Sequence, residues 1–193
     1  MKKMIALGLL ALSTMASTTV FAEAPNVSYS MPAVEVGFKW NSADYDSAIL
    51  PGTTSKQEIG FQLGTSTVFN FASSFGLKTG LFYSERPLTY ETNFLDVTTT
   101  TKAKITYFEV PALFMFKFED YAGVYVGPSI AVRLGNDNVT DPKSMIIPIT
   151  LGAQFKFLPN FGLNIFFETV PGELAKGIKS SRAVGANLMF TFD

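Results

Sequence analysis

The chain of 193 residues contains no cysteine and no histidine. A small exported domain that depended on disulfide bonds would contain paired cysteines, so burial and hydrogen bonding must hold this one together. The absence of histidine removes the most common general base of catalytic sites. No serine or threonine lies in a recognisable nucleophile motif. We therefore expect no enzymatic activity, no cofactor and no metal centre.

The chain also lacks a long apolar run beyond its N-terminus. Lys2 and Lys3 precede an apolar stretch, residues 5–15, that is too short to span a bilayer, and small residues follow at 20–22. This pattern is typical of a secretory signal peptide, so we predict that residues 1–22 are removed and that residues 23–193 form one domain. No later stretch has the ~18 consecutive apolar residues of a transmembrane helix. The formal charge of −1 is small and argues against a nucleic-acid partner.

Apolar residues nevertheless make up 47% of the chain, with 19 phenylalanines, and they occur in alternation. Successive side chains of a strand point to opposite faces, so alternation predicts strands. Long polar connections alternate with short turns, which is typical of an up-and-down meander with both termini on the short-turn, periplasmic rim. Eight strands are predicted, at about 33–40, 57–70, 75–86, 103–118, 121–134, 145–157, 161–170 and 181–192.

The two faces of these strands differ in chemistry. One face is apolar and uncharged, as Val184, Leu188 and Phe190 show for the last strand. In a water-soluble barrel, the charges of the other face would be buried in an apolar core, which is unfavourable. If the apolar face were outside instead, its phenylalanines would be exposed to water, which is also unfavourable. Lipid outside and a polar lumen inside satisfy both faces, so we predict an all-β, eight-stranded antiparallel up-and-down transmembrane β-barrel. The polar face carries glycines and the charged residues Glu35, Lys39, Glu58, Lys78, Arg86, Glu109, Lys117, Arg133, Lys156, Glu168 and Arg182.

The lumenal charges are interpreted as an internal network, because an eight-stranded barrel is just wide enough for side chains to fill it. Arg86 and Arg182 are expected nearer the long-loop rim, in contact with solvent. A narrow channel for small polar solutes is the alternative, and a soluble periplasmic barrel that binds a hydrophobic ligand is a further one. The network is predicted to pair Glu35, Glu58, Glu109 and Glu168 with Lys39, Lys78, Lys117, Arg133 and Lys156.

Prolines interrupt three of the predicted strands, at Pro111, Pro128 and Pro148. Each removes a ladder donor, which favours a bulge. Because a bulge adds a residue, it can reverse the facing of everything beyond it, Arg133 included. The loop acids offer oxygen ligands for Ca²⁺ but lack the EF-hand spacing, so we interpret them as solvated turn residues. These acids are Asp44, Asp46, Asp137 and Asp141.

Aromatic residues are predicted to form girdles at the two membrane interfaces. Trp40 and Tyr83 are expected near the long-loop rim. The short-turn rim is expected to hold Phe69, Phe71, Phe75, Phe116, Phe118, Phe155, Phe157, Phe161, Phe190 and Phe192.

Three stretches, 75–84 (FGLKTGLFYS), 107–113 (YFEVPAL) and 124–129 (VYVGPS), resemble the PorT-like outer-membrane β-barrel family. The C-terminal residues Leu188, Phe190 and Phe192 also look like the signal by which the barrel assembly machinery recognises its clients, although Asp193 follows the final aromatic. The resemblance implies an integral location in the outer membrane, in contact with lipid and lipopolysaccharide. It implies a structural or interaction role, such as adhesion, envelope integrity or part of a secretion assembly, with an unidentified partner at the loops.

Overall fold

The computed structural model describes residues 28–49, 52–94, 97–119 and 122–192; the predicted signal peptide and Asp193 lie outside them. No helix among these residues is long and apolar enough to cross a bilayer. The strands are β1 (Ser28–Tyr45), β2 (Thr53–Lys56), β3 (Glu58–Asn70), β4 (Phe75–Phe94), β5 (Val97–Glu119), β6 (Ala122–Asp137), β7 (Met145–Ile146), β8 (Ile149–Leu158), β9 (Phe161–Val170) and β10 (Ile178–Thr191).

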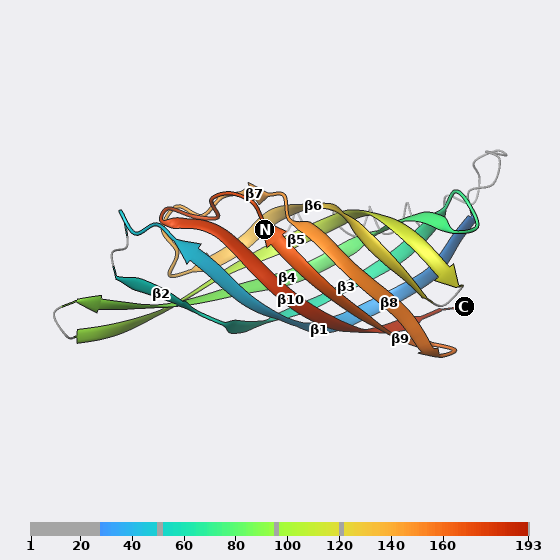
Figure 1. Cartoon of the computed structure of the whole chain (residues 1–193), viewed down its shortest axis with the longest axis horizontal. Coiled ribbons are helices and arrows are strands. Elements are labelled where there is room, and N and C mark those ends of the chain that lie inside the picture. Colours follow the sequence, from blue (N-terminus) through green and yellow to red (C-terminus); the bar gives the residue numbers. More distant parts are fainter. Residues whose placement is uncertain (1–27, 50–51, 95–96, 120–121, 193) are drawn as a thin grey trace, which may run out of the picture.

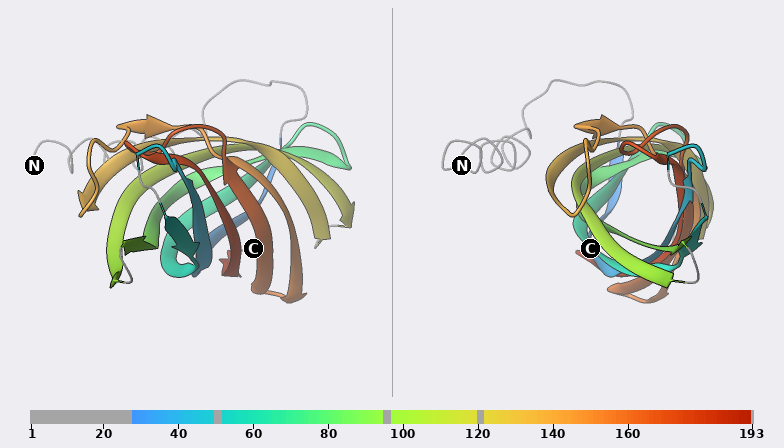
Figure 2. Two further views of the ribbon diagram at one scale, coloured as in Figure 1. Left: turned by 60° about the vertical axis from the view of Figure 1, so that its left-hand side comes forward. Right: turned by 90° about the vertical axis from the view of Figure 1, so that its left-hand side faces the viewer.

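The strands close into a barrel (Figures 1 and 2). Hydrogen-bonded neighbours run β1, β3, β4, β5, β6, β8, β9 and β10, and β10 pairs antiparallel with β1 to complete the ring. The short strands β2 and β7 pair with the ends of β4 and β6. In the described part of the chain the wall is therefore an eight-stranded antiparallel meander, which confirms the predicted fold.

Side chains alternate strictly between the two faces of the wall. Phe38 is 53% exposed on the outer face, whereas its neighbour Lys39 is completely buried in the lumen. Along β10, Val184 and Leu188 are exposed while Asn187 and Met189 are buried. Phenylalanines of neighbouring strands touch on the outside near the short turns, as in the pair Phe161–Phe190. The outer surface is thus a continuous apolar band, and polar side chains are turned inward.

The prolines do not produce the predicted bulges. The β5–β6 register is the same at Pro111↔Ser129 and at Phe114↔Val126, on either side of Pro128. A missing donor costs one hydrogen bond but adds no residue, so the facing beyond each proline is preserved. The register shifts of this pair lie elsewhere, at 106–107 and 117–119. Arg133 accordingly keeps the inward side of its strand.

The predicted long loop 87–102 is largely a strand hairpin. β4 and β5 remain paired as far as Phe94↔Val97, well beyond the residues that contact other barrel strands. The hairpin projects from the barrel at the left of Figure 1. The threonines at 98–101 explain the difference, because β-branched residues favour extended backbone even in a polar segment.

Candidate functional site: the lumen and its outer mouth

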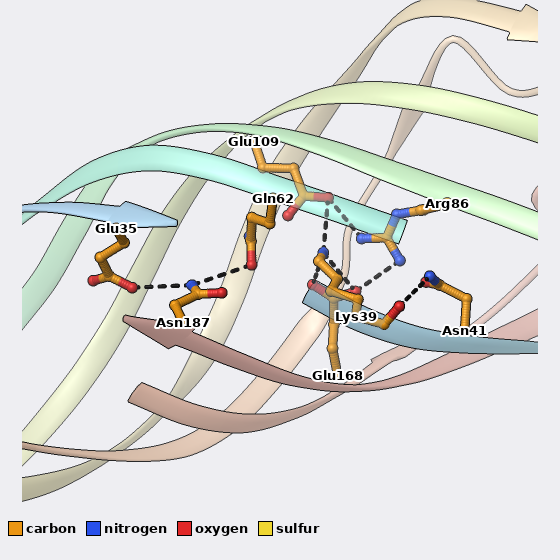
Figure 3. Close-up of polar contacts among 8 residues, drawn as sticks. All are labelled: Glu35, Lys39, Asn41, Gln62, Arg86, Glu109, Glu168 and Asn187. Carbon is orange, nitrogen blue, oxygen red and sulfur yellow. Dashed lines mark hydrogen bonds and ion pairs between the residues drawn. The ribbon is translucent and has the colours of Figure 1, made fainter. Parts of the chain in front are cut away.

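Four charged side chains meet in the middle of the lumen (Figure 3). Arg86 from β4 lies 2.7 Å from Glu109 on β5 and 2.7 Å from Glu168 on β9. Lys39 from β1 lies 3.5 Å from the same Glu109 oxygen and 3.2 Å from Glu168. All four are at least 96% buried at their side chains. We call these residues the central charge cluster.

The central charge cluster is electrically balanced, with two cations and two carboxylates. A buried charge is tolerated only when it is paired and hydrogen-bonded, and here each carboxylate contacts both cations. Aromatic faces add to the stabilisation: the Arg86 guanidinium lies 5.7 Å from the Tyr107 ring centroid, and Lys39 Nζ lies 5.9 Å from that of Phe166.

A second polar group surrounds Glu35 nearer the short-turn rim. Lys78 lies 2.9 Å from the Glu35 carboxylate and also donates to Gln154 at 2.7 Å. The amides of Asn164 and Asn187 donate to the other Glu35 oxygen at 2.7 and 3.1 Å. Ser66 on β3 also donates to Glu35, so side chains from four neighbouring strands hold this carboxylate.

Apolar side chains fill the space beside these polar groups. Val68, Leu113, Met115, Tyr125 and Phe166 form one buried cluster within the barrel. A cavity of about 40 Å³ remains, with Lys78, Glu109, Asn164 and Asn187 in its lining. That volume suits about one water molecule, whose share of liquid volume is about 30 Å³. The described lumen therefore contains side chains throughout its middle.

An apolar cluster lies at the end with the long loops. The segment 171–177, between β9 and β10, packs against the wall there and buries Leu174 and Ala175 completely. Their neighbours in the same cluster include Leu88, Ile105 and Tyr107 from the inner wall. The mouth plug, defined as Leu174, Ala175 and Ile178, lies above the central charge cluster on the route to the outside.

Backbone hydrogen bonds fasten the plug to two other loops. Asp46 N donates to Gly177 O at 2.9 Å, and Lys143 N donates to Leu174 O at 2.8 Å. The Asp46 carboxylate accepts from Ala48 N and lies 3.3 Å from Lys179, and these contacts lower the pKa of Asp46 below its usual value. The plug is thus held by two neighbouring loops.

Beside the plug, the loops form two open clefts of about 260 and 270 Å³ that share Ala103 and Asn138 in their walls. The first adds Tyr90 and Lys176, and the second adds Lys102. Asn138 has a φ of 54°, a left-handed conformation that asparagine tolerates better than most residues. The long-loop end of the molecule is therefore contoured, with both apolar and charged residues in the cleft walls.

The predicted network residues divide into two groups. The structure brings together five of them, Glu35, Lys39, Lys78, Glu109 and Glu168, in the two polar groups described above. The other four are only partly buried and lie nearer the barrel ends: Glu58, Lys117, Arg133 and Lys156. Glu58 accepts from Thr89 at 2.7 Å, and Arg133 donates to the Pro142 carbonyl at the mouth.

The two arginines predicted to be solvated behave differently from each other. Arg86 is 2% exposed and belongs to the central charge cluster, so that prediction is wrong. The strand continues for eight residues beyond the predicted end, as far as Phe94, which places Arg86 well inside the lumen. Arg182 is solvent-exposed as predicted, but it lies on the outer face, 2.7 Å from Asp44. Arg182 is two residues before Val184, so the alternation of β10 already places both side chains on the outer face.

The predicted network did not include the neutral polar residues of the lumen. Gln62, Gln154, Asn164 and Asn187 are all at least 94% buried. Asn164 and Asn187 donate to Glu35, Gln154 accepts from Lys78, and Gln62 accepts from Asn187. The signal was present, since each occupies the inward parity of its strand. The plug gave no such signal, because Leu174 lies in a loop without periodicity.

The chain matches the family described as "Outer membrane protein beta-barrel domain" over residues 4–192. Among solved structures it is similar to Neisserial surface protein A, with a TM-score of 0.56 and 15% identity, covering 86% of this chain and 99% of that one. It is also similar to the attachment invasion locus protein Ail of Yersinia pestis, with a TM-score of 0.43 and 16% identity over 82% and 97% of the two chains. No curated protein sequence matches the chain. At these identities the structural likenesses describe the fold alone.

Proposed function

Because the chain belongs to the outer membrane protein beta-barrel domain family, we propose that it is a sealed, non-conducting barrel whose long-loop end is an interaction surface. Family membership places the protein among outer-membrane barrels, in a lipid and lipopolysaccharide environment. Adhesion, envelope integrity and participation in a secretion assembly all use such a surface.

The observation that carries the proposal is the ion pair of Arg86 and Glu168 across the lumen. A conducting pore needs a continuous aqueous path, and this pair lies across that path with Lys39 and Glu109 beside it. The mouth plug adds an apolar layer on the outer side. With the lumen filled, the long loops are the surface available to a partner outside the cell.

Planar-bilayer recording tests the sealed lumen. We expect the purified, folded protein to give no reproducible current steps, while a heat-dependent shift in gel mobility shows that the barrel is closed. Stable, reproducible steps from the heat-modifiable form would overturn the proposal and favour the narrow channel for small polar solutes.

A soluble periplasmic barrel is the further alternative, and cell fractionation distinguishes it. We expect the mature chain in the outer-membrane fraction, released only by detergent. Recovery in the soluble periplasmic fraction would contradict the proposal. The absence of histidine supports a non-catalytic role, because a lumenal or loop carboxylate would have to replace the usual base.

Assembly into the membrane is part of the same proposal. Leu188 and Phe190 are exposed on the outer face of β10, and Phe192 is exposed directly after the strand. We propose that these three residues form the C-terminal signal for the barrel assembly machinery. Phe190 and Phe192 contact each other edge to face, with ring centroids 5.0 Å apart. We also propose that, within this family, the chain is a PorT-like barrel, which the stretches 75–84, 107–113 and 124–129 support.

A further inference from the structure

One cleft at the long-loop end takes its walls from all four long connections of the barrel. It is the cleft of about 260 Å³, and we call it the loop cleft. Loops that converge on a rigid scaffold are where ligands usually bind. The walls include Ile49 between β1 and β2, Tyr90 on the β4–β5 hairpin, Val139 and Thr140 between β6 and β7, and Lys176 and Ile178 where the β9–β10 connection enters β10.

The loop cleft carries an uncompensated positive charge. Lys176 is charged, whereas the other described residues of its walls are neutral. The lysines on either side of it in the same end are paired, since Lys143 lies 3.7 Å from Glu173 and Lys179 lies 3.3 Å from Asp46. Lys176 has no such acidic partner among the described residues. A single negative charge on a ligand would supply the missing partner.

The adjoining cleft of about 270 Å³ lacks this property. Its walls hold two lysines and two acids, so its charges are balanced within the protein. One of the lysines, Lys104, already lies 3.3 Å from Glu85. An anionic ligand is therefore expected in the loop cleft rather than beside it. The four charged residues of the adjoining cleft are Lys102, Lys104, Glu58 and Asp137.

Apolar side chains make up much of the loop cleft. Ile49, Val139 and Ile178 contribute aliphatic groups, and Tyr90 contributes an aromatic ring. The ring of Tyr90 packs against that of Tyr45, with ring centroids 5.2 Å apart. A sugar would need many hydrogen-bonding groups around it, so these walls favour a ligand with an apolar body.

The polar side of the loop cleft is held in place by the protein itself. Asn138 Nδ2 donates to the Lys102 carbonyl at 3.2 Å, and Asn136 Nδ2 donates to the Val139 carbonyl at 3.4 Å. These contacts fix the segment that carries Thr140, whose side chain is exposed. A wall that is ordered before the ligand arrives lowers the entropic cost of binding.

We propose that the loop cleft binds a small carboxylate with an aromatic or branched aliphatic body. The carboxylate accepts hydrogen bonds from Lys176 Nζ and the Thr140 hydroxyl, and the body packs against Ile49, Val139 and the Tyr90 ring. The cleft has the volume of about nine water molecules at ~30 Å³ each, which suits one ring or one branched chain. The inference rests on the proposed function, because it names a ligand class for the interaction surface at the long-loop end.

The bound ligand should also steady the mouth plug. Ile178 belongs both to the plug and to the wall of the loop cleft, and its amide donates to the Ala175 carbonyl at 2.9 Å. A ligand that binds only the closed arrangement of the loops reduces local opening. Hydrogen exchange at the amide of Ile178 should therefore become slower when the ligand is present.

The test uses the full mature chain in lipid nanodiscs, labelled at its isoleucine and valine methyl groups, with phenylacetate as the probe. We expect saturable changes in the methyl NMR shifts of Ile49, Val139 and Ile178. The dissociation constant should lie in the millimolar range, as for a ligand of about ten non-hydrogen atoms. Ile130 and Ile165 are exposed on the outer face, so unchanged shifts there exclude an effect of probe dissolved in the lipid.

Variants separate the two halves of the ligand. Lys176→Gln should weaken phenylacetate binding about tenfold, the loss of one charge-assisted hydrogen bond, and leave binding of the neutral phenylacetamide unchanged. Ile49→Ser should weaken both probes about threefold, because the side chain is only partly covered by the ligand. Lys56→Gln is the matched control: this lysine is 54% exposed at its side chain, is paired with Glu91 and lies outside the loop cleft.

Three results would contradict these expectations in different ways. Absence of saturable shifts in the heat-modifiable barrel, or equal affinity for phenylacetate and phenylacetamide, would overturn the inference and leave the sealed barrel intact. Saturable shifts with glucuronate and none with phenylacetate would overturn it in favour of an acidic sugar. Reproducible current steps in bilayers would contradict the sealed lumen alone.

Discussion

Arg86 and Glu168 join opposite walls of the barrel through a buried contact of 2.7 Å. Their strands, β4 and β9, are separated by four steps around the ring in either direction. Lys39 and Glu109 complete the contact from β1 and β5. The central charge cluster therefore ties together four strands as well as filling the lumen.

Arg86→Met should destabilise the barrel strongly. It leaves Glu109 and Glu168 with Lys39 as their remaining partner in the central charge cluster. Breaking a buried ion pair by removing one partner typically costs about 3–5 kcal/mol. The measurement is the free energy of unfolding in urea, with the protein in lipid vesicles.

Arg182→Met is the matched control. Arg182 makes a contact of the same length with Asp44, but about half of each side chain is exposed. An exposed pair contributes about 0–1 kcal/mol, so this variant should stay close to the wild type. Equal losses from both variants would contradict the special role of the buried cluster.

The seam between β1 and β10 should be sensitive at Gly37. A Cβ at this position would collide with the Ala186 carbonyl and with Asn187 on the facing strand. Gly37→Ala should therefore lower the free energy of unfolding of the barrel by about 1–3 kcal/mol, the usual cost of overpacking. The measurement is the temperature at which the folded gel band is lost. Gly135→Ala, where a Cβ has open space, should leave that temperature unchanged.

The fold could be predicted because one signal runs through nearly the whole chain. Lipid outside and a filled lumen inside require opposite chemistry on alternate residues, so parity alone places Lys39 inside and Phe38 outside. The same parity places Asn164 and Asn187 in the lumen, where both are buried. The prolines made the predicted facing of the residues beyond them less certain, but the β5–β6 register is unchanged across Pro128.

The position along the barrel axis was harder to predict. Parity says that Arg86 faces inward but not how far β4 continues, and its burial depends on those extra residues. The mouth plug depends on tertiary contacts of Leu174 with wall residues such as Leu88, far away in the sequence. Loop segments carry no period, so their packing cannot be predicted from alternation.

Leu174→Ser should loosen the mouth without unfolding the barrel. Leu174 is fully buried in the plug, and a hydroxyl there loses apolar contacts and lacks an assured partner. Its amide donates to the Ile178 carbonyl at 2.9 Å, so hydrogen exchange at residues 174 and 178 should become faster by roughly tenfold or more. The unfolding midpoint in urea should change little.

Glu173→Ser provides the control, because the Glu173 side chain is about half exposed and lies 3.7 Å from Lys143. Its amide exchange should remain close to that of the wild type. If the two variants exchange alike, the plug is not held by the burial of Leu174.

Phe192→Ala should reduce assembly into the outer membrane more than it reduces stability. Phe192 is 55% exposed on the outside of the barrel, so its side chain contributes lipid contact and packing against Phe190. Phe157→Ala removes a side chain of nearly equal exposure, 52%, from the outer face of β8. Both variants should therefore refold similarly in detergent, because they lose similar outer-face contacts. In cells, we expect less heat-modifiable protein for Phe192→Ala than for Phe157→Ala, measured in the outer-membrane fraction. Equal amounts would show that Phe192 serves only as part of the aromatic girdle.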